Sequence, residues 1–169
     1  MALGRGNIPL LELSREQVDV WLVYVDDTYD DNLIYAYHNM LAEQELLQES
    51  RFYFPKDQHR FLLTRALVRD VLSRYVTISP KDWRFEQNEF GRPSIANDDV
   101  NAKQISFNIS HADGLIILGV VKDRAVGVDT ERLTRIAPVQ NANRYFYNSE
   151  TQALQRLQPS LQQQRFFEL

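Results

Sequence analysis

The stretch that most constrains the fold is an apolar run from Gly114 to Val121, which is followed at once by a second extended segment. The run is rich in β-branched residues and too short for a typical helix, which indicates a buried strand. The turn residues Lys122-Asp-Arg124 separate it from Ala125–Glu131. This arrangement predicts a β-hairpin of residues 114–121 and 125–131, and therefore antiparallel pairing.

Two further segments have the composition of strands. Residues 18–25 are dense in β-branched and aromatic side chains, which predicts a buried strand, and residues 105–110 predict another. A short strand is expected at residues 83–87, before a turn that Gly91 and Pro93 impose.

Helical patterns lie on both sides of these strands. A helix is expected over residues 39–48, and the longest one between Pro55 and Tyr75, with Asp57 as its N-cap. Residues 148–157 and 159–167 predict two more helices. Antiparallel strands combined with separate helices favour an α+β fold.

Composition excludes several classes of protein. The 169 residues contain no cysteine, so disulfides, thiolate metal sites and cysteine nucleophiles are excluded. The net charge of −4 argues against general binding of nucleic acid. No apolar stretch is long enough to cross a bilayer, and the N-terminus lacks the apolar core of a signal peptide. We therefore expect a soluble cytoplasmic protein that binds neither nucleic acid nor membrane.

Positive charge is concentrated in one short region, which contains Arg51, Arg60, Arg65, Arg69 and Arg74. The arginines of the longest helix, Arg65 and Arg69, lie on the side opposite its apolar positions. Such a concentration fits either a solvated helix face or a local site for a phosphate group. Charge pattern alone leaves both interpretations open.

Two carboxylates recur at strand spacing in Gly127-Val-Asp-Thr-Glu131. Residues two apart in a strand share a face and lie roughly 7 Å apart, so Asp129 and Glu131 lie together beside Gly127. A divalent cation would relieve their repulsion, and magnesium commonly uses one or two carboxylates with substrate phosphates. The alternative is an exposed strand end whose acids pair with Arg124 or Arg132.

Two other short patterns could bind an anion. Asn108 and Ser110 form a polar strand face that ends beside His111, at a turn where binding groups are often presented. His111 could donate to a phosphate or simply satisfy a backbone carbonyl. The bracket Gly91-Arg92-Pro93 fixes the backbone around one cation, although such turns are frequent.

The order of these patterns is more specific than any one of them. Gly91-Arg92-Pro93, Phe107-Asn-Ile-Ser-His111 and, sixteen residues later, Gly127-Val-Asp-Thr-Glu131 resemble the motifs of the 4'-phosphopantetheinyl transferase family. The similarity covers roughly residues 51–169. It resembles most the monomeric, two-lobed kind, in which each lobe is an antiparallel sheet packed on a long helix.

The resemblance implies a set of site residues and a reaction. It implies Mg²⁺ held by Asp129 and Glu131, coenzyme A as co-substrate, and His111 as a catalytic group beside these acids. A serine of an apo acyl or peptidyl carrier protein would attack the β-phosphate and release 3',5'-ADP. The residues implied to contact coenzyme A are Arg60, Arg65, Gly91, Arg92, Pro93, Asn108, Ser110 and His111.

The resemblance also carries two departures. Thr130 stands where the family usually has an aliphatic residue, and the family's Trp-x-x-Lys-Glu motif would begin directly after Leu169. We therefore expect an N-terminal lobe at residues 1–124 and the start of a truncated C-terminal lobe at residues 125–169. If these residues are the whole protein, we expect weak or absent coenzyme A binding and little transfer. The alternative is a degenerate, non-catalytic homologue that binds a carrier protein or another partner.

Overall fold

The structure is a computed structural model that describes residues 9–89, 91–132 and 136–169. The chain divides into two compact units, residues 1–129 and residues 130–169, which we describe separately. Within the described ranges, no helix combines the length and the apolar character that a membrane crossing requires.

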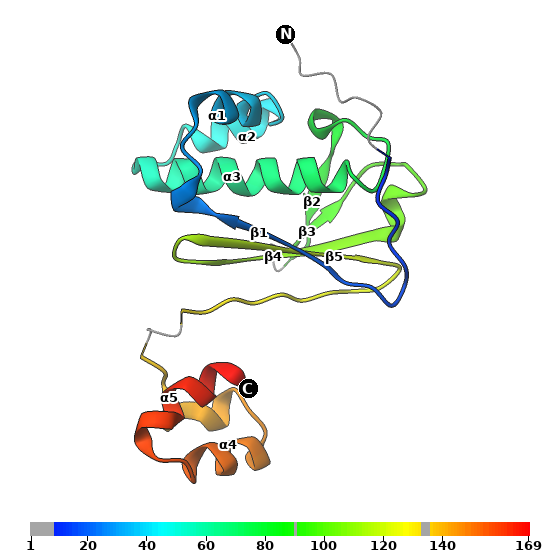
Figure 1. Ribbon diagram of the computed structural model, residues 1–169. Coiled ribbons are helices and arrows are strands. Elements are labelled where there is room, and N and C mark those ends of the chain that lie inside the picture. The colour runs from blue at the N-terminus through cyan, green and yellow to red at the C-terminus, as the bar shows by residue number, and fades with distance from the viewer. Residues whose placement is uncertain (1–8, 90, 133–135) are drawn as a thin grey trace. The chain divides into compact units, whose positions relative to one another are not determined.

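The first unit is built on a three-stranded antiparallel sheet (Figure 1). Its strands are β1 (Asp19–Tyr24), β4 (Ile105–Ala112) and β5 (Leu115–Lys122), in the order β1-β5-β4. A tight turn joins β4 to β5, and Gly114 in that turn has a φ of +81°, in the left-handed region that favours glycine. Strands β2 (Phe85–Gln87) and β3 (Pro93–Ile95) form a separate small hairpin.

Helix α3 (Pro55–Leu72) covers one face of this sheet (Figure 1). Its buried Val68 and Leu72 pack in one core with Leu118 of β5 and Phe107 of β4. Helices α1 (Asp31–His38) and α2 (Glu43–Glu49) pack on α3 from the side away from the sheet. The predicted α+β fold with antiparallel sheets is confirmed, and α3 is the predicted longest helix.

The predicted pairing of residues 114–121 with residues 125–131 is wrong. The partners of β5 are β4 on one side and β1 on the other, with Ile117 opposite both Ser110 and Leu22. A strand has only two hydrogen-bonding edges, and both edges of β5 are taken. Residues 125–129, which we call the strap, contain no strand and pass over the sheet face opposite α3, where Val128 lies against Gly119.

Three smaller predictions need correction. Strand β1 forms as expected but is not buried, because Val20, Leu22 and Tyr24 are each more than half exposed at the edge of the sheet. Helix α3 begins at Pro55, and Asp57 lies in its first turn instead of capping it. Helix α2 begins four residues later than expected, and the preceding α1 was not predicted.

The regular elements of the second unit, over its described residues, are all helices. A 3-10 helix (Val139–Arg144) precedes α4 (Asn148–Gln155) and α5 (Pro159–Glu168), as the sequence predicted for the two α-helices. The Tyr147 N–H donates to the Glu150 carboxylate at 2.9 Å and so caps α4. Leu154 and Phe166 form its core. The expected lobes at residues 1–124 and 125–169 stay a prediction.

Candidate functional site

A groove of about 520 Å³ lies in the first unit between α3 and the edge strand β4, with the β2–β3 hairpin contributing to its wall. Five of the residues predicted to contact coenzyme A line it: Arg60, Arg65, Pro93, Asn108 and His111. These residues come from three separate segments of the chain. The sequence showed only the order of these segments, and the fold brings their side chains to one groove.

The arginines supply positive charge to this groove. Arg60 is exposed and donates to the Asp57 carboxylate at 3.0 Å, which orders it along the first turns of α3. Arg65 lies over the Phe61 ring, 5.3 Å from its centroid, in a cation–π contact. Burial lowers the pKa of Arg65; the carboxylate of Glu45, 3.6 Å away, opposes this shift, and nearby Arg69 adds to it. A guanidinium still remains protonated in such surroundings.

Arg69 fits neither of the two interpretations that the charge pattern left open, a solvated helix face or a site for a phosphate group. Its side chain is buried and donates from Nε to the Glu45 carboxylate at 2.7 Å. Its Nη1 is within hydrogen-bond distance of the carbonyl oxygens of Pro80, Lys81 and Trp83. The closest of the three is that of Pro80, at 2.8 Å. Arg69 therefore fixes the segment after α3 and is not available to a ligand.

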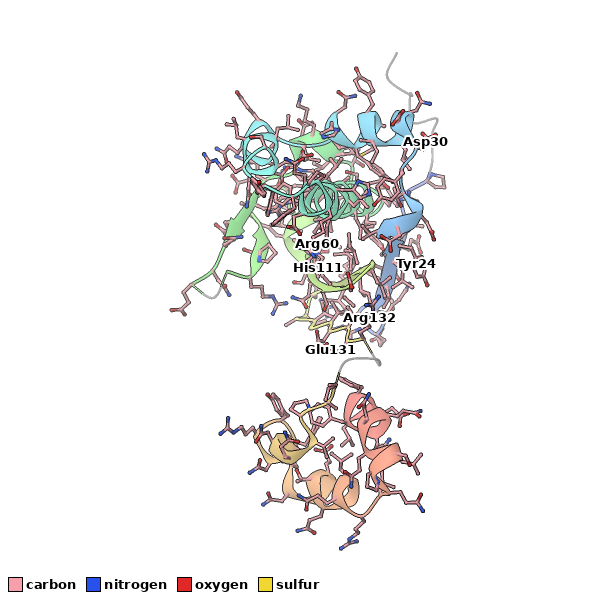
Figure 2. The ribbon with its side chains drawn as sticks, turned by 90° about the vertical axis from the view of Figure 1, so that its left-hand side faces the viewer. Tyr24, Asp30, Arg60, His111, Glu131 and Arg132 are labelled. Carbon is pink, nitrogen blue, oxygen red and sulfur yellow. The ribbon has the colours of Figure 1, made fainter. Side chains whose placement is uncertain are left out.

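His111 reaches the groove from the end of β4. Its Nε2 lies 3.0 Å from the hydroxyl of Thr64, which is buried on α3. Figure 2 shows His111 and Arg60 close together beside the end-on view of α3. Partial burial lowers the pKa of His111 below its usual 6.5, and the positive charge of Arg60 lowers it further. The sequence had left open that His111 bonds a backbone carbonyl, but over the described residues its partner is the Thr64 hydroxyl.

The strap presents Asp129 on the other side of β4. Ser110 donates to the Asp129 carboxylate at 3.0 Å, and the Asn108 side-chain oxygen accepts the Val128 N–H at 2.9 Å. These bonds hold the strap along the polar strand face that the sequence identified. The predicted contacts of Asn108 and Ser110 with coenzyme A stay predictions.

The Gly91-Arg92-Pro93 bracket belongs to the β2–β3 hairpin. Gly91 has a φ of +76°, so the turn itself requires a residue that tolerates the left-handed region. The Arg92 guanidinium donates to the Val126 carbonyl at 2.7 Å and ties the strap to the hairpin. Of the three residues, only Pro93 lines the groove.

The sequence predicted Asp129 and Glu131 as the magnesium ligands. Glu131 belongs to the second unit and is exposed. Over the described parts of the chain, no group of three or more His, Cys, Asp or Glu side chains gathers as a metal site. The donors fit magnesium, because a carboxylate that accepts one hydrogen bond keeps further lone pairs for a hard cation. Their role as ligands stays a prediction.

Several residues that line the groove were not identified from the sequence. Phe52 and Phe61 form an aromatic wall with ring centroids 5.4 Å apart, and Thr64 and Gln87 contribute polar atoms. The i,i+4 spacing of Arg60 and Thr64 was the available signal for Thr64, since it places both on one helix face. No comparable signal pointed to Gln87, which comes from β2.

Comparison with known proteins decides the family. A family model described as "4'-phosphopantetheinyl transferase, N-terminal" matches residues 30–122, more than half of the chain. The chain belongs to the 4'-phosphopantetheinyl transferase family. The matched range ends with β5, so it covers α1 to β5 and the groove.

Several members of this family resemble the chain over most of its length. The 4'-phosphopantetheinyl transferase HetI of Nostoc sp. is 29% identical and covers 94% of the chain. The enzyme gsp of Aneurinibacillus migulanus is 28% identical over 90% of the chain, and ffp of Bacillus subtilis is 39% identical over 59%. The chain spans 66%, 61% and 42% of these three relatives, which is less than two thirds of each.

Proposed function

We propose that this protein transfers the 4'-phosphopantetheine group from coenzyme A to a serine of an apo acyl or peptidyl carrier protein, and that the transfer depends on Mg²⁺. The observation that carries the proposal is the groove at β4, which joins Arg60, Arg65 and His111 on one side of the strand, while Ser110 holds Asp129 on the other side. Family membership supports the same reaction class.

The nucleotide end of coenzyme A matches the lining of the groove. A phosphate monoester and a diphosphate require cationic donors, which Arg60 and Arg65 supply, and arginine can bind phosphate oxygens bidentately. The aromatic wall of Phe52 and Phe61 offers apolar area next to these charges. The groove volume of about 520 Å³ is in the range of small-molecule sites.

Asp129 and Glu131 are the proposed magnesium ligands. Bound there, magnesium would neutralise charge on the diphosphate. The chain's own contribution is positional: Ser110 orients the Asp129 carboxylate, and Arg92 and Asn108 fix the strap that carries it. Arg60 and Arg65 would hold the negative charge that stays on the departing nucleotide.

The proposed reaction breaks one bond and forms one. The carrier serine oxygen attacks the β-phosphorus, the bond from that phosphorus to the bridging oxygen breaks, and 3',5'-ADP leaves with the bridging oxygen. The serine proton is released to solvent, so the products are the holo-carrier, 3',5'-ADP and one proton. Transfer of this kind depends mainly on positioning and electrostatic stabilisation.

The test is holo-carrier formation, measured by the mass gained by an apo carrier protein in the presence of coenzyme A and magnesium. We expect Asp129→Asn to abolish transfer, because the amide can still accept from Ser110 but carries no charge for the metal. Asp123→Asn is the matched control, since Asp123 pairs with Arg15 on another part of the same unit. Equal transfer by wild type and Asp129→Asn would contradict the proposal.

The arginines are tested separately by coenzyme A binding. Arg65→Gln should weaken binding by roughly ten- to a hundredfold, the usual effect of removing a charge-assisted contact. Carrier binding that persists in Asp129→Ala without coenzyme A or magnesium, with no transfer by wild type, would instead favour the non-catalytic homologue.

A further inference from the structure

Thr64 is a buried threonine whose hydroxyl joins two of the residues in the groove. Its Oγ1 lies 2.7 Å from the Arg60 carbonyl oxygen, one helical turn back, and 3.0 Å from Nε2 of His111. Thr64 thus connects α3 to the end of the edge strand β4, at a distance of 47 residues in sequence. Neither the sequence patterns nor the proposed reaction assigned it a role.

Proton accounting determines the direction of both hydrogen bonds. A hydroxyl has one proton to donate, and a carbonyl oxygen can only accept, so the Thr64 proton goes to the Arg60 carbonyl. The Thr64 oxygen must then accept from His111, which requires a proton on Nε2. The imidazolium has a proton on Nε2 in any case. The neutral ring must also keep its single proton there, so it is the Nε2–H tautomer.

The remaining nitrogen of His111 follows from the same accounting. Within the described residues, the ring's only hydrogen bond is the one to Thr64, so Nδ1 keeps its capacity for a ligand. His111 is partly exposed and lines the groove beside Arg60. A ligand phosphate in this groove would therefore meet Nδ1, which donates to it in the imidazolium form.

We propose that Thr64 is a positioning residue: its hydroxyl holds the His111 ring with Nε2–H toward α3 and presents Nδ1 to a phosphate of the nucleotide bound in the groove. The part of this proposal that concerns the phosphate ligand rests on the proposed function. The orientation and the tautomer of the His111 ring are independent of that function, because they follow from contacts inside the protein.

The first test needs no ligand. Nitrogen-15 NMR of the imidazole rings at neutral or mildly alkaline pH reports which nitrogen is protonated, and His111→Gln identifies the His111 signals among the three histidines. We expect Nε2–H as the only neutral tautomer in wild type and in Thr64→Ser. In Thr64→Val we expect the second tautomer to become populated and the Nε2 proton to lose its protection. A wild-type signal from an unprotonated Nε2 would overturn the proposal.

The second test measures the affinity for 3',5'-ADP by calorimetry. Thr64→Val should weaken binding roughly three- to tenfold, the usual effect of one misplaced hydrogen bond, and Thr64→Ser should restore it. Thr28→Val is the matched control, because the Thr28 hydroxyl also donates to a carbonyl four residues back, that of Tyr24 at 3.0 Å, and this bond involves no histidine.

The two tests separate the inference from the proposed function. Equal affinities for 3',5'-ADP in wild type and Thr64→Val would refute positioning by Thr64, even if carrier transfer is normal. Absence of 3',5'-ADP binding in wild type would refute the ligand role of Nδ1 together with the proposed function, while the NMR result would still decide the tautomer.

Discussion

Replacing Arg69 with methionine tests the conclusion that this arginine is structural. The guanidinium is buried and pairs with Glu45, which is itself buried on α2. Methionine keeps much of the aliphatic volume of the side chain but removes every donor. In wild type, Nε of Arg69 lies 2.7 Å from the Glu45 carboxylate. The change therefore leaves this carboxylate inside the protein without its closest cation.

Breaking a buried ion pair by removing one partner costs about 3–5 kcal/mol, because the other charge stays buried. Two contacts of Glu45 remain and reduce this cost: the Ala42 N–H at 3.0 Å and Arg65 at 3.6 Å. The carbonyls that Arg69 binds after α3 also lose their charged donor, and this loss increases the cost in stability. We expect a loss of about 3–4 kcal/mol, a large part of the 5–15 kcal/mol typical of a domain.

Urea unfolding monitored by tryptophan fluorescence measures this loss, since Trp83 lies in the core next to the affected segment. Arg15→Met is the control, because the Arg15–Asp123 pair is exposed and should contribute less than about 1 kcal/mol. Adding Glu45→Gln to Arg69→Met should recover part of the loss by removing the stranded charge. A loss below about 1 kcal/mol for Arg69→Met would refute the structural role.

Three further perturbations test the fold and the site. Leu118→Ala, at a fully buried position, should cost about 2–5 kcal/mol in urea unfolding, whereas Leu22→Ala on the exposed face should cost far less. Gly114→Ala should lower stability by about 1 kcal/mol, because its φ of +81° suits glycine and an added Cβ would approach Asp26. The lowered pKa of His111 means that the unfolded chain binds its proton more readily, so its contribution to stability is present above pH 6.5 and is lost as pH falls through the folded pKa. Melting temperatures at several pH values should therefore fall more steeply on acidification in wild type than in His111→Gln, and parallel curves would contradict this.

Local patterns in the sequence predicted the elements well. The apolar spacing on Leu63, Ala66 and Leu67 after Pro55 indicated α3, and the alternation in Phe107–His111 indicated β4. These patterns depend on neighbours within one or two turns, so periodicity reports them directly. The same alternation placed Asn108 and Ser110 on one face, and the strap lies on that face.

Pairing and burial were less predictable. The edges of β5 are occupied by β4 and by β1, and β1 is distant in sequence, whereas adjacency favoured residues 125–131. Arg69 belongs to the polar side of an isolated helix, but Glu45 on α2 compensates its charge and allows it to be buried. Thr64 carried no apolar signal, and its importance depends on a histidine from another element.

By itself, the sequence determined the α+β class, the main helices and the order of motifs that the family match then supported. Only the tertiary structure decided which groups meet: Arg60, Arg65 and His111 at one groove, and Asp129 with Ser110 on the other side of β4. Backbone propensity acts between near neighbours, whereas a site depends on hydrogen bonds and charges that become close only when distant segments pack. The direction of the Thr64–His111 bond is one such property.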